Sequence, residues 1–291
     1  MSGRSASPRR EKPLVLLTND DGYFSPGISA LAARLRPDFE VRIVAPDRER
    51  SANSLSLTLR RPLRLFKVRP GVHAVDGTPA DCIYLALKGV LPRRPDLLIS
   101  GMNLGPNLGE QDIAYSGTVA AAIQGTFLGI PSVAVSLIPD ACGNFILGPA
   151  AAFVAAAARR LLAKPLPPGV TLNINIPPPP VRGVRVSGLG RKRYEPEIVE
   201  KKDPRGRRYY WIGTSDPEAS GDARSDVRAI ADGFISLTPL HTDLTDYRTM
   251  RHPGLARLRS SLRSAAGKPA KSAPGRGAGG GGTRRRRGPS K

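Results

Sequence analysis

Short, continuous apolar runs recur through the first half of the chain and predict buried strands. They lie at residues 14–18, 41–45, 97–100 and 132–136, and each is too short for a typical helix. A strand that is apolar on both faces is typical of a parallel sheet covered by helices on both sides. The pattern therefore predicts a mostly parallel sheet buried between two layers.

Helical patterns separate these strands. Ile28, Leu31 and Leu35 recur at the spacing of one helix face, and Thr78-Pro-Ala-Asp has the residues of a helix start, with Thr78 as the N-cap. Two further helices are expected in Ala-rich segments, at 119–128 and 150–163. Strands that alternate with helices in this way predict a doubly wound α/β fold.

The segment from residue 190 to 240 differs in character from this body. Stretches at 197–201 and 207–212 flank Asp203-Pro-Arg-Gly, a strong turn signal, and predict a β-hairpin. Such a hairpin has little core of its own. We therefore expect this C-terminal extension to serve in oligomerisation, packed on another subunit or exchanged with it.

The net charge of +21 is unevenly distributed along the chain. Twelve Lys and Arg residues and no acidic residue lie between 251 and 291, and residues 1–12 are also basic. We expect a disordered N-terminus at 1–12, a folded domain at 13–250, and a basic, low-complexity, largely disordered tail at 251–291. The tail has the charge for nonspecific contact with polyanions such as RNA, or it is a solvated tail without a dedicated partner.

Cysteine content and hydropathy indicate a compartment. Cys82 and Cys142 are the two cysteines of the chain, so no disulfide framework is expected and a reducing cytoplasm is the default. The polar N-terminus lacks the apolar core of a secretory signal, and no stretch approaches the roughly 20 apolar residues of a membrane helix. We expect a cytoplasmic protein without a membrane partner.

Ligands of open α/β sheets bind beyond the carboxyl ends of the strands, and three polar clusters are predicted there. The first, Asn19-Asp20-Asp21-Gly22, directly follows the strand at 14–18. Two adjacent carboxylates repel each other unless a cation or a proton intervenes, and Mg²⁺ and Mn²⁺ prefer oxygen ligands. An Asp-Gly turn with a helix cap is the alternative interpretation of these residues.

The other two clusters follow later strands. Residues 46–54 combine hydroxyls, an amide and two arginines that can meet phosphate, although an ordinary surface loop has a similar composition. The Gly-rich segment 100–109 leads to Ser116-Gly117-Thr118, where a helix start would offer N–H groups to an anion. Together the three clusters predict a metal and phosphate site at one edge of the sheet.

These segments closely resemble the SurE family of 5′/3′-nucleotidases. The matching motifs run in order and at compatible spacing from about residue 13 to residue 247. Those that carry the resemblance most strongly are Leu17-Thr-Asn-Asp-Asp-Gly, Ala45-Pro-Asp-Arg-Glu-Arg-Ser, Gly77-Thr-Pro-Ala-Asp-Cys, Ser100-Gly-Met-Asn-Leu-Gly-Pro-Asn-Leu-Gly, Tyr115-Ser-Gly-Thr-Val and Thr238-Pro-Leu-His-Thr-Asp-Leu-Thr.

The resemblance implies a Rossmann-like body in a homodimer or homotetramer. It also implies hydrolysis of nucleoside 5′- and 3′-monophosphates, and of short polyphosphate in some members, with one Mg²⁺ or Mn²⁺ ion per subunit. Carried over by motif, the metal ligands are Asp20, Asp21, Ser51 and Asn103, and the first two are also the catalytic residues. Contacts to phosphate or substrate are expected from Asn19, Asn53, Asn107, Ser116, Gly117 and Thr118.

Asp20 is our choice for orienting or deprotonating the attacking water, with a role as ligand only as the alternative. An aspartyl-phosphate route is disfavoured, because Gly22 stands two residues after Asp20, where a haloacid-dehalogenase-type phosphatase has a second Asp. The first strand is also not followed by a dinucleotide-binding glycine motif. A protein that binds nucleic acid through its basic tail remains the alternative function, since the folded region lacks an interleaved basic and aromatic surface.

Overall fold

The structure is a computed structural model that describes residues 11–195, 197–213 and 218–265. The chain divides into two compact units, Met1–Asp243 and Leu244–Lys291, which we describe separately. The predicted N-terminus at 1–12 lies almost entirely outside the described residues. Within the described part of the chain, no helix combines the length and the apolarity needed to cross a membrane.

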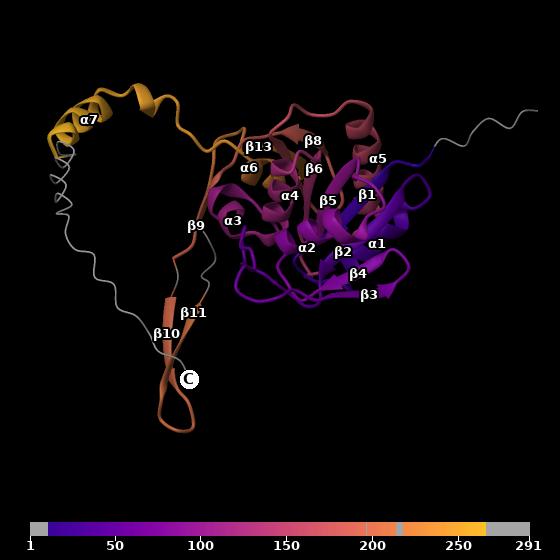
Figure 1. Ribbon diagram of the computed structural model, residues 1–291. Coiled ribbons are helices and arrows are strands. Elements are labelled where there is room, and N and C mark those ends of the chain that lie inside the picture. The colour runs from indigo at the N-terminus through magenta and orange to yellow at the C-terminus, as the bar shows by residue number, and fades with distance from the viewer. Residues whose placement is uncertain (1–10, 196, 214–217, 266–291) are drawn as a thin grey trace, which may run out of the picture. The chain divides into compact units, whose positions relative to one another are not determined.

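The main sheet of the first unit has the strand order β3-β4-β2-β1-β5-β6-β7-β13-β8 (Figure 1). The bounds are β1 Leu14–Thr18, β2 Glu40–Pro46, β3 Leu65–Arg69, β4 Val72–Val75, β5 Leu97–Leu104, β6 Ser132–Leu137, β7 Val170–Ile176, β8 Gly183–Val186 and β13 Phe234–His241. The five central strands, β2, β1, β5, β6 and β7, are parallel, as predicted, so their carboxyl ends meet at one edge. The sheet is mixed at its margins, because β3 is antiparallel to β4 and β13 to β7.

Helices cover both faces of this sheet (Figure 1). On one face lie α1 (Pro26–Leu35) and α5 (Leu147–Ala163), and on the other α2 (Pro79–Leu85) and α4 (Gly117–Phe127). Val15 and Leu17 of β1 belong to the core under α1 and α5, whereas Leu16 belongs to the core under α2 and α4. Each such fully buried side chain contributes roughly 1.5–3 kcal/mol. The two-sided burial confirms the doubly wound fold.

The start of α2 follows the predicted capping chemistry. The Thr78 hydroxyl accepts a hydrogen bond from Asp81 N–H, and the Asp81 carboxylate accepts one from Thr78 N–H. This reciprocal pair satisfies two backbone donors that the helix leaves unpaired. A π-helical turn, η1 (Ala86–Val90), continues the helix.

The predicted hairpin is present in the C-terminal extension. Strand β10 (Glu197–Lys202) pairs antiparallel with β11 (Arg208–Gly213), and the Asp203 carboxylate holds the turn by accepting from the N–H groups of Arg205 and Arg207. Two short strands, β9 (Arg191–Arg193) and β12 (Glu218–Ser220), also pair antiparallel, and helix α6 (Asp226–Ala231) precedes β13.

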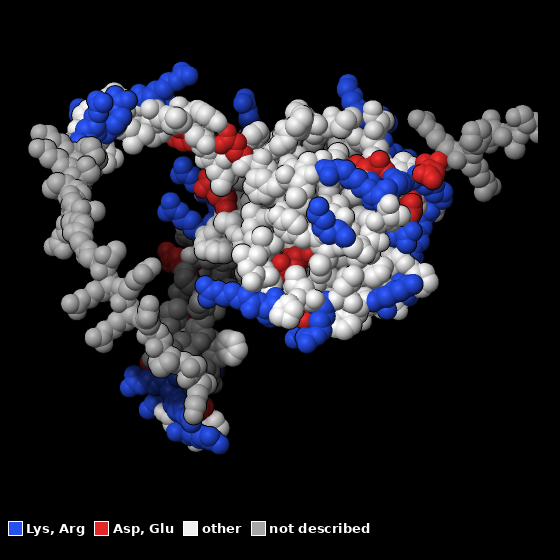
Figure 2. Space-filling view, in the orientation of Figure 1, with Lys and Arg blue, Asp and Glu red and all other residues white. Residues whose placement is uncertain are grey.

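The second unit differs from the expected tail. A 3-10 turn, η2 (Thr249–Arg251), precedes helix α7 (Pro253–Ala265), where we predicted a largely disordered segment from residue 251. The helix has a physical basis in a proline at its first turn and in Leu255, Leu258 and Leu262, which recur on one face. The rest of the tail lies outside the described residues. Basic side chains gather on α7 and on the β10–β11 hairpin, whereas the visible face of the body carries both signs (Figure 2).

Candidate active site

The loop after β1 is shaped by its first residue. Asn19 is 0% exposed, its side-chain N–H donates to Gly22 O (2.9 Å), and its side-chain oxygen accepts from Gly22 N–H (3.2 Å). Gly22 has a φ of +102°, a conformation that other residues adopt only under strain. Asn19 thus shapes the turn that presents Asp20 and Asp21, and its predicted contact with substrate stays a prediction.

Helix α4 begins directly against Asp20, as the Ser-Gly-Thr motif predicts. Ser116 caps the helix by accepting from Val119 N–H (3.0 Å), and the Thr118 hydroxyl donates to Asp20 Oδ1. A Cβ added at Gly117 would lie only 2.8 Å from both Cβ and Oδ2 of Asp20. Glycine is therefore required here, because it lets the positive end of the helix approach the carboxylate.

The two carboxylates lie in an environment that disfavours negative charge. Burial raises the pKa of Asp20, which is 5% exposed. Burial, and next the charges of Asp20 and Glu49, raise the pKa of Asp21 to about 7. Asp21 Oδ2 is buried without a hydrogen-bond partner. A nearby cation would favour the ionised form of both carboxylates.

The loop after β2 bonds to the backbone of Asp20. Arg50 N–H donates to Asp20 O (2.7 Å), and the Asn53 amide nitrogen donates to Arg50 O (2.8 Å). Asn53 therefore shapes the loop, and no contact in the structure tests its predicted role toward substrate. Ser51 is exposed, and its hydroxyl donates to Glu49 Oε1 (2.8 Å), so this predicted metal ligand faces a third carboxylate.

Asn103 lies near the carboxyl end of β5, the strand that pairs with β1. In the pairing of β1 with β5, Thr18 lies opposite Ser100, and the β5–β6 register shifts between Ser100 and Asn103. The Asn103 amide nitrogen donates to Gly105 O (2.8 Å), which leaves the amide oxygen as the atom that a cation would take. The predicted carboxyl-end arrangement of these side chains thus holds.

Asn107 bonds to other residues of the protein, and its predicted contact with substrate stays a prediction. Its side-chain nitrogen donates to Ser136 Oγ (2.7 Å), and its backbone N–H donates to Asn175 Oδ1 (2.9 Å). Asn173 and Asn175 both donate to its carbonyl oxygen, at 3.0 and 2.9 Å. Asn107 is therefore a buried anchor of the Gly-rich segment, and its amide nitrogen is already used by the protein.

The donor set fits a hard divalent cation. Among the described residues, no three His, Cys, Asp or Glu side chains gather as a metal cluster. The site instead combines two carboxylates with the neutral oxygens of an amide and a hydroxyl. Oxygen ligands of this kind suit Mg²⁺ or Mn²⁺, and the unpartnered Asp21 Oδ2 is the atom in most need of such a partner.

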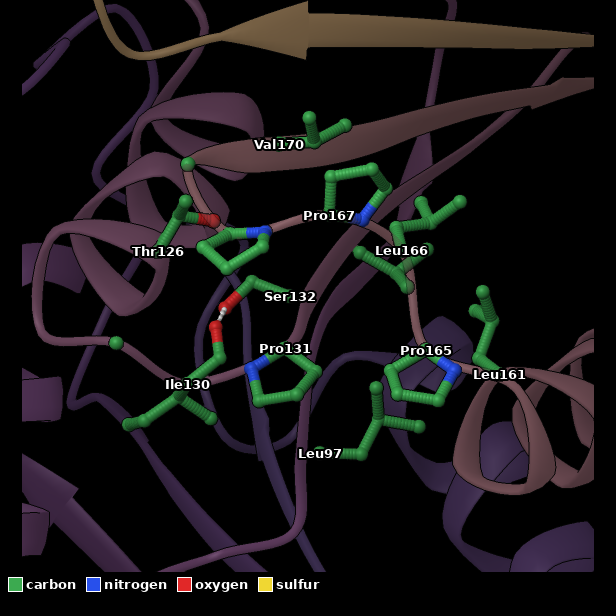
Figure 3. A pocket seen from close by; sticks show the side chains of 14 residues that line it. Leu97, Thr126, Ile130, Pro131, Ser132, Leu161, Pro165, Leu166, Pro167 and Val170 are labelled. Carbon is green, nitrogen blue, oxygen red and sulfur yellow. Dashed lines mark hydrogen bonds between the residues drawn. The ribbon is translucent and has the colours of Figure 1, made fainter.

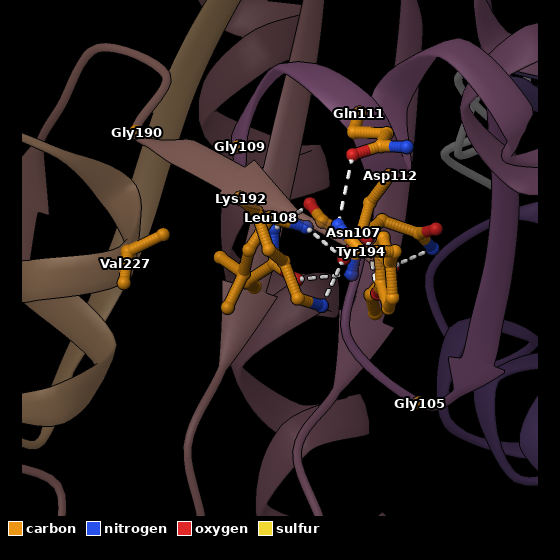
Figure 4. Close-up of polar contacts among 12 residues, drawn as sticks. Gly105, Asn107, Leu108, Gly109, Gln111, Asp112, Gly190, Lys192, Tyr194 and Val227 are labelled. Carbon is orange, nitrogen blue, oxygen red and sulfur yellow. Dashed lines mark hydrogen bonds and ion pairs between the residues drawn. The ribbon is translucent and has the colours of Figure 1, made fainter. Parts of the chain in front are cut away.

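A second group of polar residues beside the site was missed by the sequence analysis. Helix α3 (Gly109–Tyr115) replaces the end of the predicted loop, and its Asp112 accepts hydrogen bonds from Lys192 and Tyr194 (Figure 4). The partners lie 80 or more residues away in sequence, so no local pattern reveals them. Glu49 was also missed, although it belongs to one of the quoted motifs.

The opposite edge of the sheet holds an apolar pocket of about 350 Å³ (Figure 3). It lies at the amino ends of β5, β6 and β7, away from Asp20. Its hydroxyls are already bonded, since Ser132 Oγ donates to Ile130 O and Thr126 Oγ1 pairs with Thr171 Oγ1. The lining contains no titratable side chain, so this pocket offers no group for catalysis.

Comparison with known proteins identifies the family of this chain. The profile of the family described as Survival protein SurE matches residues 15–196. The chain is 51% identical over 247 residues to the 5′-nucleotidase SurE of Symbiobacterium thermophilum, which covers 81% of this chain and 95% of that protein. It is 48% identical over 236 residues to the 5′-nucleotidase SurE of Syntrophotalea carbinolica, which covers 81% and 94%.

A solved structure extends the comparison to the fold. The crystal structure of the SurE protein from Aquifex aeolicus matches with a TM-score of 0.74 at 39% identity, and covers 85% of this chain and 100% of that chain. The family profile alone spans more than half of the sequence, and the relatives align over most of it. The chain therefore belongs to the SurE family.

Proposed function

We propose that this chain is a divalent-metal-dependent phosphomonoesterase that hydrolyses nucleoside 5′-monophosphates to nucleoside and phosphate. The observation that carries the proposal is the buried Asp20 carboxylate set against the N-terminus of α4, next to the half-buried Asp21. The carboxylates favour a bound cation, and the N–H groups at the start of α4 favour an anion. A phosphate ester that lies between the cation and these N–H groups fits both preferences. The names of the relatives, 5′-nucleotidase SurE, support the same substrate class.

The residues of the site have distinct roles in the proposed reaction. Backbone N–H groups of Gly117 and Thr118 bind phosphate oxygens at the start of α4 and stabilise the charge that develops in the transition state. The Thr118 hydroxyl orients the Asp20 carboxylate. Asp20 holds the attacking water in line and accepts its proton, and the burial that raises the pKa of Asp20 makes it a stronger base.

Asp20, Asp21, Asn103 and Ser51 are the residues that we propose to hold one Mg²⁺ or Mn²⁺ ion per subunit. When bound, the ion would neutralise phosphate oxygens and lower the pKa of a water molecule. The Ser51 hydroxyl hydrogen already points to Glu49, so its oxygen lone pairs remain for a cation.

An activity assay tests this proposal directly. The purified protein should release phosphate from AMP or GMP with Mn²⁺ or Mg²⁺, EDTA should abolish the release, and added Mn²⁺ should restore it. A panel of 5′-monophosphates, 3′-monophosphates and short polyphosphate would then define the substrate range, which we propose to include all three classes. Absence of phosphate release with every divalent ion would contradict the function.

We further propose a cytoplasmic homodimer or homotetramer. On the β10–β11 hairpin, Ile198, Tyr210, Trp211 and Ile212 are each more than half exposed, which is typical of a surface that pairs with another subunit. Light scattering after size-exclusion chromatography should give a dimer or tetramer mass, and the double substitution Trp211→Ser with Ile212→Ser should lower it. A monomeric wild-type protein would contradict this assembly.

Nucleic-acid binding through the basic C-terminus is the alternative function. In the described part of this segment, α7 carries Arg257, Arg259 and Arg263, with no acidic residue in its first turn. Deletion of residues 251–291 should remove salt-sensitive nucleic-acid binding while phosphatase activity stays intact. Loss of phosphate release on this deletion would instead assign the tail to the enzyme.

A further inference from the structure

Helix α3 is held to the C-terminal extension by one buried carboxylate. Asp112 accepts hydrogen bonds from Lys192 Nζ (2.6 Å), from the Tyr194 hydroxyl (2.6 Å) and from Leu108 N–H (3.1 Å). The side chains of Lys192 and Asp112 are only 11% and 7% exposed. Figure 4 shows Lys192 and Tyr194 reaching from the extension toward Asp112. We call these three side chains the α3 clamp.

A second buried carboxylate holds the start of the same helix. Asp226 accepts from Gly109 N–H (2.9 Å) through one oxygen and from Gly190 N–H (2.8 Å) through the other. A Cβ added at Gly109 would lie 2.8 Å from Gly190 O, so the two segments touch through their backbones. The extension therefore holds both the first residue of α3, Gly109, and its fourth residue, Asp112.

The far end of α3 contacts the catalytic groups. Ser116 N–H donates to Asp112 O (2.8 Å), and Ser116 is the cap of α4, whose Gly117 and Thr118 touch Asp20. The Ser54 hydroxyl donates to Ala114 O (2.9 Å), which ties the loop after β2 to the same helix end. Hydrogen bonds, together with the backbone from Ser116 to Thr118, thus connect Lys192 and Tyr194 to Asp20.

We propose that Lys192 and Tyr194 are positioning residues for the phosphate site, which act on Asp20 and the start of α4 through Asp112. The inference rests on the function proposed above, because that function assigns the phosphate contacts to the first turn of α4. Neither residue is assigned to touch substrate. Both set the position of α3, and α3 sets the positions of the α4 cap and the loop after β2.

The chemistry of the clamp indicates what each substitution does. Burial alone would lower the pKa of Lys192, but the bonds to Asp112 and Tyr194 outweigh it and raise that pKa, so the ammonium stays charged. Lys192→Met removes this charge at similar length and leaves the Asp112 carboxylate buried with fewer donors. Tyr194→Phe removes one hydroxyl, keeps the ring and is the milder change.

The test measures kcat, KM and metal affinity on full-length variants. We expect kcat for AMP to fall by about 100-fold in Lys192→Met and by about 10-fold in Tyr194→Phe, with KM changed less, since misplaced groups act mainly on the transition state. The Mn²⁺ dissociation constant, measured by electron paramagnetic resonance without substrate, should rise about tenfold. Lys192→Arg should restore part of both losses.

Matched controls come from the hairpin that follows the clamp. Lys201→Met and Tyr209→Phe make the same chemical changes at exposed positions and should leave kcat and Mn²⁺ affinity at wild-type values. Circular dichroism and thermal melts ensure that each variant is folded at the assay temperature. If Lys192→Met does not fold, Tyr194→Phe carries the test.

The outcomes separate this inference from the proposed function. Wild-type kcat, KM and Mn²⁺ affinity in a folded Tyr194→Phe variant would overturn the positioning role, even if its melting temperature is lower. A wild-type protein that hydrolyses no phosphomonoester would overturn the proposed function instead. In that case Mn²⁺ affinity still decides whether the clamp positions Asp20.

Discussion

The two edges of one parallel sheet are built in opposite ways in this protein. At the carboxyl ends of β1 and β5, carboxylates and amides are buried against a helix start that admits no side chain at Gly117. At the amino ends of β5, β6 and β7, leucine and proline side chains line a pocket in which Ser132 and Thr126 already bond to the protein.

The difference lies in which groups still lack a partner. The carboxyl edge contains an Asp21 oxygen without a hydrogen bond, and burial raises the pKa of both Asp20 and Asp21. A buried, unpaired charge costs free energy, so a fold tolerates it where a ligand offsets that cost. The amino edge has no such group in its lining. Chemistry is therefore expected at one edge and packing alone at the other.

The largest effect should come from Asp20→Asn. This change removes the proposed base and one metal ligand, so kcat for AMP should fall by roughly 10³-fold. The melting temperature without metal should stay the same or rise, because Asn removes a buried charge at nearly constant volume. Asp38→Asn is the control, since Asp38 lies at the surface and pairs with Arg159. Unchanged turnover in Asp20→Asn would contradict the assignment of the chemistry to the carboxyl edge of the sheet.

The next largest effect should come from Gly117→Ala, which tests whether α4 must lie close to Asp20. In Gly117→Ala the new methyl group would meet Asp20 at 2.8 Å, so the carboxylate or the helix must shift, and kcat should fall by about 100-fold. Gly148→Ala is a matched control in α5, because a Cβ there meets nothing within 4 Å. Equal kinetics for the two alanine variants would show that the approach is not needed for turnover.

The parts of this edge that the sequence predicted are those encoded by local patterns. The strand at 14–18, the helix start at Gly117 and the carboxyl-end rule together place Asp20, Asn103 and Thr118 at one edge, and the structure agrees. The motif also named Asn19 and Asn107, but it cannot say which partner an amide takes. In the fold their nitrogens bond to Gly22 and Ser136, so they shape loops.

The parts that the sequence did not predict depend on contacts between distant residues. Helix α3 lacks a clear apolar period, and its position is fixed by Lys192 and Asp226, which lie far along the chain. Strand β13 enters the sheet between β7 and β8 through long-range pairing. The β3 strand was missed because all of its residues are exposed. Periodicity reports the burial of a segment and not the identity of its neighbours.

A smaller effect concerns pH and the carboxyl edge alone. The pKa of Asp21 is about 7 in the folded protein and near 3.8 when unfolded, so the folded state binds more protons between these values. The contribution of Asp21 to stability without metal should therefore be largest below about pH 4 and be lost as pH rises to about 7, by on the order of 1 kcal/mol after allowance for solvent screening. Urea unfolding in EDTA measures this slope.

Two comparisons make the pH experiment decisive. Asp21→Asn should flatten the slope, because the substituted amide does not titrate. Saturating Mn²⁺ should reverse it, since the ion binds the ionised carboxylates and stabilises the folded state. A slope that is identical in wild-type and Asp21→Asn proteins would contradict the assignment of Asp21 as the titrating group.

The smallest effect should come from the amino edge. Leu166 lines the apolar pocket and is already 39% exposed, so Leu166→Ala removes only part of a buried side chain. We expect the free energy of unfolding to fall by about 1 kcal/mol or less, and kcat and KM for AMP to stay within about twofold of wild type. Strands β5 and β6 connect the two edges, so a tenfold loss of kcat here would mean that packing at one edge sets the geometry of the other. Wild-type kinetics with a slightly lower melting temperature would instead confine the chemistry to the carboxyl edge, where the unpartnered charges lie.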